Sequence, residues 1–161
     1  MNKYAPHVYV IPEDDCDRQL AEGFVDHYQV RDTRIKVMPP AGGWEKVLKT
    51  FRDEYIPTLR ANQNTHVILL IDFDDQVDGR TAHFYQEVPP ELKARVFVIG
   101  SSDEPETLKK AMKMIGYKAI GKQLADDCAA GTATYWDHEQ LRHNDAERLR
   151  LVQTVRPFLF G

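Results

Sequence analysis

The sequence predicts an α/β fold in which a mainly parallel, four-stranded sheet is doubly wound with helices. Three observations support this fold class. Short runs of β-branched and aromatic residues recur along the chain, a segment with the apolar spacing of a helix follows each run, and Pro or Gly separates the units. Strands that alternate with helices make right-handed crossovers, which give a parallel sheet with helices on both faces.

The first strand is expected over His7 to Ile11, since this β-branched and aromatic run ends at Pro12. Apolar residues then recur at spacings of about four and share one face of a helix: Cys16, Leu20, Phe24, Val25 and Tyr28. A second strand is expected over Arg34 to Met38. The helix after it carries its apolar stripe from Trp44 to Tyr55, and Pro57 is expected to bend or end it.

The third strand, Val67 to Ile71, is expected to be central, because a continuous apolar run suits a strand covered on both faces. A helix around Arg80 to Glu87 and a fourth strand over Arg95 to Ile99 follow. Asp103 and Glu106 then have the spacing of a capping box for the next helix.

The whole chain, residues 1–161, is expected to form one domain. Residues 1–114 make the strand and helix core, and residues 115–161 form a helical C-terminal extension. The extension is predicted to contain helices at 118–129 and 138–155. No repeat or linker in the sequence indicates a second domain.

The composition is that of an ordinary globular protein, with 42% hydrophobic and 29% charged residues. No run approaches the roughly 20 apolar residues that span a bilayer, so we expect a cytoplasmic protein with no membrane contact. The two cysteines, Cys16 and Cys128, lack metal-ligand spacing and are expected to be reduced thiols. A net charge of -4 argues against coating nucleic acid by bulk electrostatics, but it is compatible with a metal-dependent nuclease.

Acidic residues follow two of the predicted strands. Glu13, Asp14 and Asp15 come after the first strand, and Asp72, Asp74 and Asp75 come after the third. Ligand sites of open α/β sheets lie beyond the carboxyl ends of the strands, so these carboxylates meet if the two strands are neighbours. Clustered carboxylates repel one another unless a cation binds them, and Mg²⁺ or Mn²⁺ favours oxygen ligands.

The sequence therefore predicts a Mg²⁺ or Mn²⁺ site. Its expected ligands are Glu13, Asp14, Asp72, Asp74 and Asp75. Alternate residues of a strand point the same way, so Asp72 and Asp74 are expected to grip one ion together. The alternative is that the aspartates only cap helices, Asp14, Asp15 and Asp17 the first and Asp72 to Asp75 the third, because Asp is a favoured N-cap residue.

Substrate contacts are expected from the loops that follow the second and fourth strands. Gly42 and Gly43 open a helix, where free N–H groups can hold a phosphate, although the absence of a GxGxxG or GxxxxGK(S/T) motif favours a simple flexible turn. Ser101 follows the fourth strand at the same edge of the sheet.

Two segments resemble the Toprim domain of topoisomerases, bacterial primases and related nucleases. The sequence VYVIPEDDCDRQL places Glu13 after a strand, and VILLIDFDD ends in the pair Asp72 and Asp74. The resemblance covers residues 8–102 and implies a Rossmann-like sheet. It also implies metal-dependent, nuclease-like phosphodiester chemistry on nucleic acid, with Glu13 as general acid/base or metal ligand and the two aspartates as Mg²⁺ ligands. These three residues are then the catalytic set.

The chain departs from the family pattern where Gly commonly follows the Glu, since Asp14 stands there, and the nearest Gly after Asp75 is Gly79. A non-catalytic Toprim-like module that binds a protein partner or a second copy of itself is therefore the alternative. The chain is also similar in outline to receiver domains of phosphorelay systems, through Asp14, Asp15, Asp72 and Ser101. Receivers need a Lys after a fifth strand, and no apolar strand precedes Lys118 or Lys122.

Overall fold

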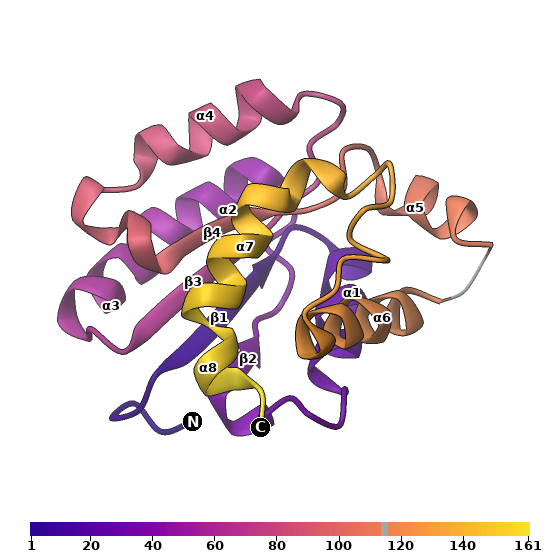
Figure 1. The fold of residues 1–161 in the computed structure, drawn as a ribbon. Helices are drawn as coiled ribbons and strands as arrows, with labels where there is room; N and C mark the ends of the chain where they lie inside the picture. The colour runs from indigo at the N-terminus through magenta and orange to yellow at the C-terminus, as the bar shows by residue number, and fades with distance from the viewer. Residues whose placement is uncertain (114–115) are drawn as a thin grey trace.

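A single sheet with four parallel strands in the order β2-β1-β3-β4 forms the centre of the computed structural model (Figure 1). The structure describes residues 1–113 and 116–161. The strands are β1 (His7–Pro12), β2 (Ile35–Val37), β3 (Thr65–Leu70) and β4 (Val96–Ile99). β3 pairs with β1 on one side and β4 on the other, so the third strand is central, as the sequence predicts. The predicted parallel α/β fold is confirmed.

Helices cover both faces of the sheet, which makes the fold doubly wound (Figure 1). The described helices are α1 (Asp15–Val25), α2 (Trp44–Thr50), α3 (Ile56–Ala61), α4 (Val77–Glu87), α5 (Pro105–Ala111), α6 (Tyr117–Ala130), α7 (Asp145–Thr154) and α8 (Arg156–Leu159). Helices α2, α3 and α4 cover one face, and α1, α6, α7 and α8 cover the other. Among the described residues, no helix has the length and apolar character needed to cross a membrane.

The strands alternate between two apolar layers. Along β3 and the residue after it, Val67, Leu69 and Ile71 pack against the α2, α3 and α4 side and are fully buried. Ile68 and Leu70 point to the opposite side, toward α1, α6 and α7. This alternation follows from the two-residue period of a strand, and it explains why the third strand is a continuous apolar run.

Pro57 does not end the second helical segment. The chain passes from α2 through a π-helical turn, Phe51–Tyr55, directly into α3. The N–H of Ile56 donates to the carbonyl of Phe51, five residues earlier. A proline has no N–H and its ring crowds the carbonyl four residues before it, so the wider turn admits Pro57 without breaking the helix.

Three local predictions are wrong. Tyr28 lies beyond the end of α1 and is exposed, so it does not belong to the apolar face of that helix. Asp103 and Glu106 form no capping box, because α5 begins only at Pro105 and the Asp103 carboxylate accepts a hydrogen bond from the Thr107 hydroxyl.

The predicted helix over 138–155 is also interrupted. A 3-10 turn, Arg142–Asn144, precedes α7, which begins only at Asp145. The buried Asn144 side chain explains the break, since its amide bonds the backbone of Gly100 beyond β4 and fixes the chain there. The predicted boundary between Met114 and Ile115 lies outside the described residues.

Side chains of the C-terminal region cover the outer edge of β4. The N–H of Val98 donates to Glu147 Oε2 at 2.9 Å, and Arg150 Nη2 donates to the carbonyl of Val96 at 3.2 Å. The Asn144 amide accepts from the N–H of Gly100 at 3.2 Å and donates to its carbonyl at 2.9 Å. An uncovered edge strand is a template for pairing with another chain. The C-terminal extension therefore satisfies this edge without adding a strand.

Candidate metal centre

The site lies beyond the carboxyl ends of β1 and β3, where the strand order changes direction. Chain order runs from β1 outward to β2 and then back across β1 to β3, and such switch points leave a crevice at the sheet edge. The first and third strands are neighbours and pair from His7 to Pro12, which meets the condition for the acids that follow them to lie at one edge. The N–H of Glu13 continues the ladder by donating to the carbonyl of Leu70 at 2.9 Å.

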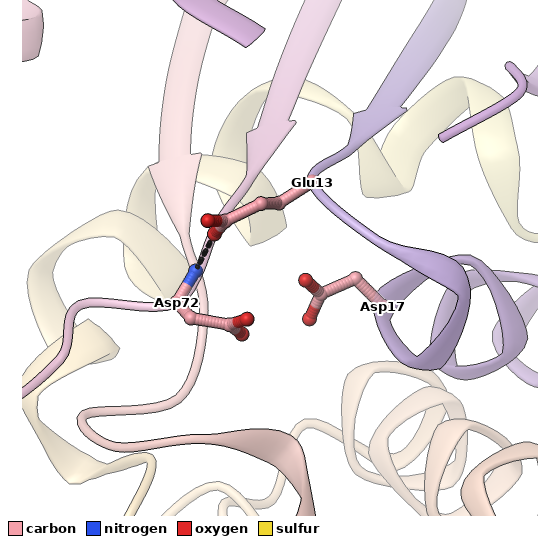
Figure 2. A group of neighbouring side chains, drawn as sticks. All are labelled: Glu13, Asp17 and Asp72. Atoms are coloured by element: carbon pink, nitrogen blue, oxygen red, sulfur yellow. Dashed lines mark hydrogen bonds between the residues drawn. The ribbon is translucent and has the colours of Figure 1, made fainter. Parts of the chain in front are cut away.

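Glu13 reaches across from β1 to the end of β3. Its Oε2 accepts a hydrogen bond from the backbone N–H of Asp72 at 2.6 Å (Figure 2). Glu13 is 9% exposed and Asp72 is 6% exposed. The contact fixes two acidic residues from different strands against each other in a place that excludes most water.

A third carboxylate comes from the first turn of α1. Asp17 is 1% exposed, and its side chain points toward that of Asp72 (Figure 2). One oxygen from each of Glu13, Asp17 and Asp72 lies within 4.8 Å of the others. Among the described residues, both oxygens of Asp17 and Oδ1 of Asp72 lack a hydrogen-bond partner. Buried polar atoms without a partner are rare, so this group needs an explanation.

Burial and mutual repulsion disfavour negative charge on these side chains. Burial, followed by the negative charges of the nearby Asp14 and Glu13, raises the pKa of Asp72 to about 8. Burial, followed by the charges of Asp72 and Asp14, holds the pKa of Asp17 well above its usual range. Burial also raises the pKa of Glu13, although the hydrogen bond from Asp72 opposes that rise. Without a counter-charge, the group therefore retains protons at neutral pH.

The donor set fits a hard divalent cation. Mg²⁺ binds oxygen at about 2.1 Å and Ca²⁺ at about 2.3–2.6 Å, so two oxygens on one ion lie at most roughly 4–5 Å apart. The three carboxylates already meet that separation and include unpartnered oxygens. The N-terminal end of α1 adds the positive end of a helix dipole beside Asp17.

Asp74 lies outside this group. Its backbone has a φ of 49°, so the extended alternation that would align it with Asp72 does not continue through the loop. Its exposed carboxylate pairs with Arg80 Nη1 at 2.6 Å. The expectation that the two aspartates grip one ion through strand alternation is therefore wrong, because the strand has ended at Leu70.

The other two predicted ligands also have different surroundings. Asp14 is the N-cap of α1, and its Oδ1 accepts the N–H of Asp17 at 2.9 Å. The capping interpretation is thus correct for Asp14, which still adds negative charge beside Asp72. Asp75 is exposed, and its backbone N–H donates to the carbonyl of Ser102.

The predicted phosphate cradle is wrong. The N–H groups of Gly42 and Gly43 both point at the carbonyl of Glu13, at 2.8 and 3.3 Å, so they are not free. The two glycines have φ values of 94° and 136°, which side chains rarely adopt, and this turn brings α2 up to the end of β1. Ser101 is buried, and its hydroxyl donates to the carbonyl of Asp103.

Arg80 of α4 supports the other side of the Asp72 loop. Its Nη1 donates to the carbonyl of Asp72 at 2.9 Å and to Asp74, and its guanidinium lies 4.6 Å from the ring centre of Trp44. Glu13 holds the N–H of Asp72 while Arg80 holds its carbonyl. The residue is thereby fixed from both ends of its backbone.

The sequence analysis did not select Asp17 or Arg80 as site residues. An Asp in the first turn of a helix is common and reads as a favourable charge at the helix start. The sequence does place Asp17 four residues after Glu13, across the junction between the strand and the helix. This spacing is the feature that could have indicated a third acid at the same edge of the sheet. Arg80 lies in a different helix and carried no motif.

Comparisons with protein-family models, with curated proteins and with solved structures find no match for this chain. The fold and the carboxylate group therefore stand on their own geometry.

Proposed function

We propose that this protein performs divalent-metal-dependent phosphodiester chemistry on a nucleic acid, with Glu13, Asp17 and Asp72 holding Mg²⁺ or Mn²⁺. The observation that carries the proposal is the Asp17 carboxylate, which is 1% exposed, finds no hydrogen-bond partner in the described part of the chain and faces Asp72. A buried carboxylate without a donor is costly unless a cation compensates it. The resemblance of the two acidic segments to the Toprim family supports the choice of reaction.

Each residue has a distinct part in this proposal. Asp17 and Asp72 supply the unpartnered oxygens that bind the ion. Glu13 orients Asp72 by accepting its N–H, and burial raises the pKa of Glu13, which favours the protonated form that a general acid needs. A bound divalent ion polarises a phosphate and lowers the pKa of water.

Calorimetric titration with Mn²⁺ tests the metal site. We expect wild type to bind, Asp17→Asn and Asp72→Asn to lose most of the affinity, and Asp75→Asn to bind normally, because Asp75 is an exposed acid of the same loop. No binding by wild type at millimolar Mn²⁺, or equal binding by Asp17→Asn and wild type, would remove the site.

A cleavage assay tests the reaction. Wild type is incubated with end-labelled single-stranded and duplex DNA and with RNA, each with Mg²⁺, Mn²⁺ or a chelator. We expect metal-dependent products that Asp72→Asn does not form. Metal binding without cleavage of any of these substrates would instead support the non-catalytic module.

A second candidate is a receiver-like phosphoacceptor, which the strand order favours. The order β2-β1-β3-β4 is the beginning of the flavodoxin-like order found in receiver proteins, and Asp72 follows β3. Against it, no lysine of the described residues is paired with Glu13, Asp17 or Asp72. Incubation with acetyl phosphate and Mg²⁺ decides: transfer of the phosphoryl group to Asp72 releases acetate and adds one phosphate to the intact mass.

A further inference from the structure

An apolar cavity lies between the sheet and the helices that cover its α1, α6 and α7 face. Its volume is about 110 Å³, and its lining is almost entirely apolar. Its lining includes Ile68 and Leu70 of β3, Ala21 of α1, Leu124 of α6, and Val155 at the junction between α7 and α8. Figure 1 shows α7 crossing this face of the sheet beside α1 and α6.

The side chains of β3 are packed less completely on the face with the cavity than on the opposite face of the sheet. Val67 and Leu69, on the side of α2 and α3, are fully buried. Ile68 and Leu70 belong to the same central strand and yet are only partly buried. Since β3 has a neighbouring strand on each side, the remaining exposure of these two residues reflects incomplete filling under α7.

The volume and apolar lining of the cavity suit a small apolar ligand. Protein interiors hold few voids larger than a water molecule. An engineered apolar cavity of about 150 Å³ stays dry and binds benzene, which sets the scale for a ring or a chain of about six carbons here. The near absence of polar lining atoms excludes a polar ligand from the interior.

The positively charged side chain of Arg156 lies where the cavity meets the surface. Arg156 and Phe160 line both the cavity and an adjoining surface depression that includes Gln29 and Gly161. Arg156 donates from Nε to the carbonyl of Cys128 at 2.7 Å and from Nη2 to that of Ala129 at 2.8 Å. These bonds leave Nη1 for another acceptor, and Arg156 forms no ion pair with any described residue.

We propose that this cavity binds the apolar part of a small amphipathic carboxylate, whose anionic head pairs with Arg156. The site takes an anion with a six-carbon chain or ring, whereas the carboxylate group beyond β1 and β3 takes a cation. None of Glu13, Asp17 and Asp72 lines the cavity, so the two sites share none of these side chains.

The test compares three probes of equal chain length, hexanoate, 1-hexanol and hexylammonium, in chelator-treated protein by thermal melting and methyl NMR. We expect hexanoate and hexanol to raise the thermal midpoint and to shift methyl signals of Ile68 and Leu70, with hexylammonium weakest. Arg156→Gln should weaken hexanoate about two- to fivefold, the usual range for an exposed ion pair, and leave hexanol unchanged.

Variants that fill the space provide the control. Ala21→Leu places a larger side chain in the cavity and should abolish binding of all probes, while Ala119→Leu makes the same change on the exposed side of α6 and should not. Val152→Leu, on α7, serves if Ala21→Leu does not fold. The proposal fails if wild type binds neither hexanoate nor hexanol, or if filling leaves their binding intact. Equal affinity for hexanoate and hexylammonium would remove the role of Arg156.

Discussion

The carboxylate of Glu13 accepts the backbone N–H of Asp72 at 2.6 Å, which ties the end of β1 to the end of β3. This contact uses an acidic side chain to satisfy a main-chain donor at the point where the sheet ladder stops. It also places a negative charge beside the buried Asp72 carboxylate and so helps to raise the pKa of that group. The same hydrogen bond therefore supports the fold and prepares the site for a cation.

Removing one carboxylate of the group should stabilise the protein when metal is absent. We expect Asp17→Asn to raise the free energy of unfolding by about 1–3 kcal/mol at pH 9, because it removes a buried acid for which the described residues offer no partner and which lies beside other carboxylates. Added Mg²⁺ should raise the thermal midpoint of wild type and not that of the variant. Thermal melts of both proteins with and without Mg²⁺, at matched ionic strength, check this. A lower midpoint for Asp17→Asn, with no Mg²⁺ response in wild type, would show that Asp17 is structural.

The contribution of Asp72 to the free energy of unfolding of the metal-free protein should fall as pH rises, because Asp72 loses its proton. The folded-state pKa of this residue is about 8 and its ordinary value is 3.8, so between these values the folded state binds more protons than the unfolded state. The contribution of Asp72 to stability is therefore complete at low pH and is lost as pH rises toward and through 8.

Urea titrations of wild type and Asp72→Asn from pH 5 to pH 9 measure this contribution as a difference. The difference is needed because buried His66 and half-buried His143, whose pKa values burial lowers, change stability in the opposite direction. We expect wild type to lose stability relative to Asp72→Asn as pH rises, and saturating Mg²⁺ to remove that trend. Parallel curves for the two metal-free proteins would contradict the raised pKa.

Arg80 should act as a positioning residue for the metal site. Arg80→Met removes the donor to the Asp72 carbonyl and the partner of Asp74, and we expect Mn²⁺ affinity to fall about tenfold, in the range seen when groups that orient metal ligands are lost. Arg80→Lys should recover only part of the affinity, since one ammonium lacks the planar fork of a guanidinium. Arg52→Met removes an exposed arginine of the neighbouring segment and is the matched control. Calorimetry that finds Arg80→Met and Arg52→Met equivalent would rule out this role.

Glu147 should protect the edge of the sheet. In Glu147→Ala the N–H of Val98 loses its acceptor and the Tyr85 hydroxyl loses a partner, so we expect a loss of about 1–3 kcal/mol in the free energy of unfolding. Hydrogen exchange at the Val98 amide should become faster than at the amides of the inner strands. A global loss of stability alone would speed exchange throughout the sheet instead. Glu139→Ala changes an exposed glutamate of the same region and should have little effect. Unchanged protection at Val98 would show that α7 does not guard β4.

Much of the fold could be predicted because the signals were local. Apolar runs such as Val67 to Ile71 identified the strands, and the alternation of strands with helices identified a parallel sheet. Errors arose where distant contacts overrode local pattern. The helix predicted from His138 starts only at Asp145, because Asn144 is held by Gly100. Pro57 is accommodated by a π-helical turn that no local rule specified.

By itself the sequence determined that acids follow the first and third strands and that those strands end at one edge of a parallel sheet, since periodicity and chain order depend only on neighbouring residues. The tertiary structure decided which acids meet. It brought Asp17 of α1 against Asp72, turned Asp74 outward to Arg80 and used the N–H groups of Gly42 and Gly43 to hold the carbonyl of Glu13. The physical reason is that side-chain direction past the end of a strand is set by the loop backbone and by helix packing, and neither is encoded in the spacing of the residues.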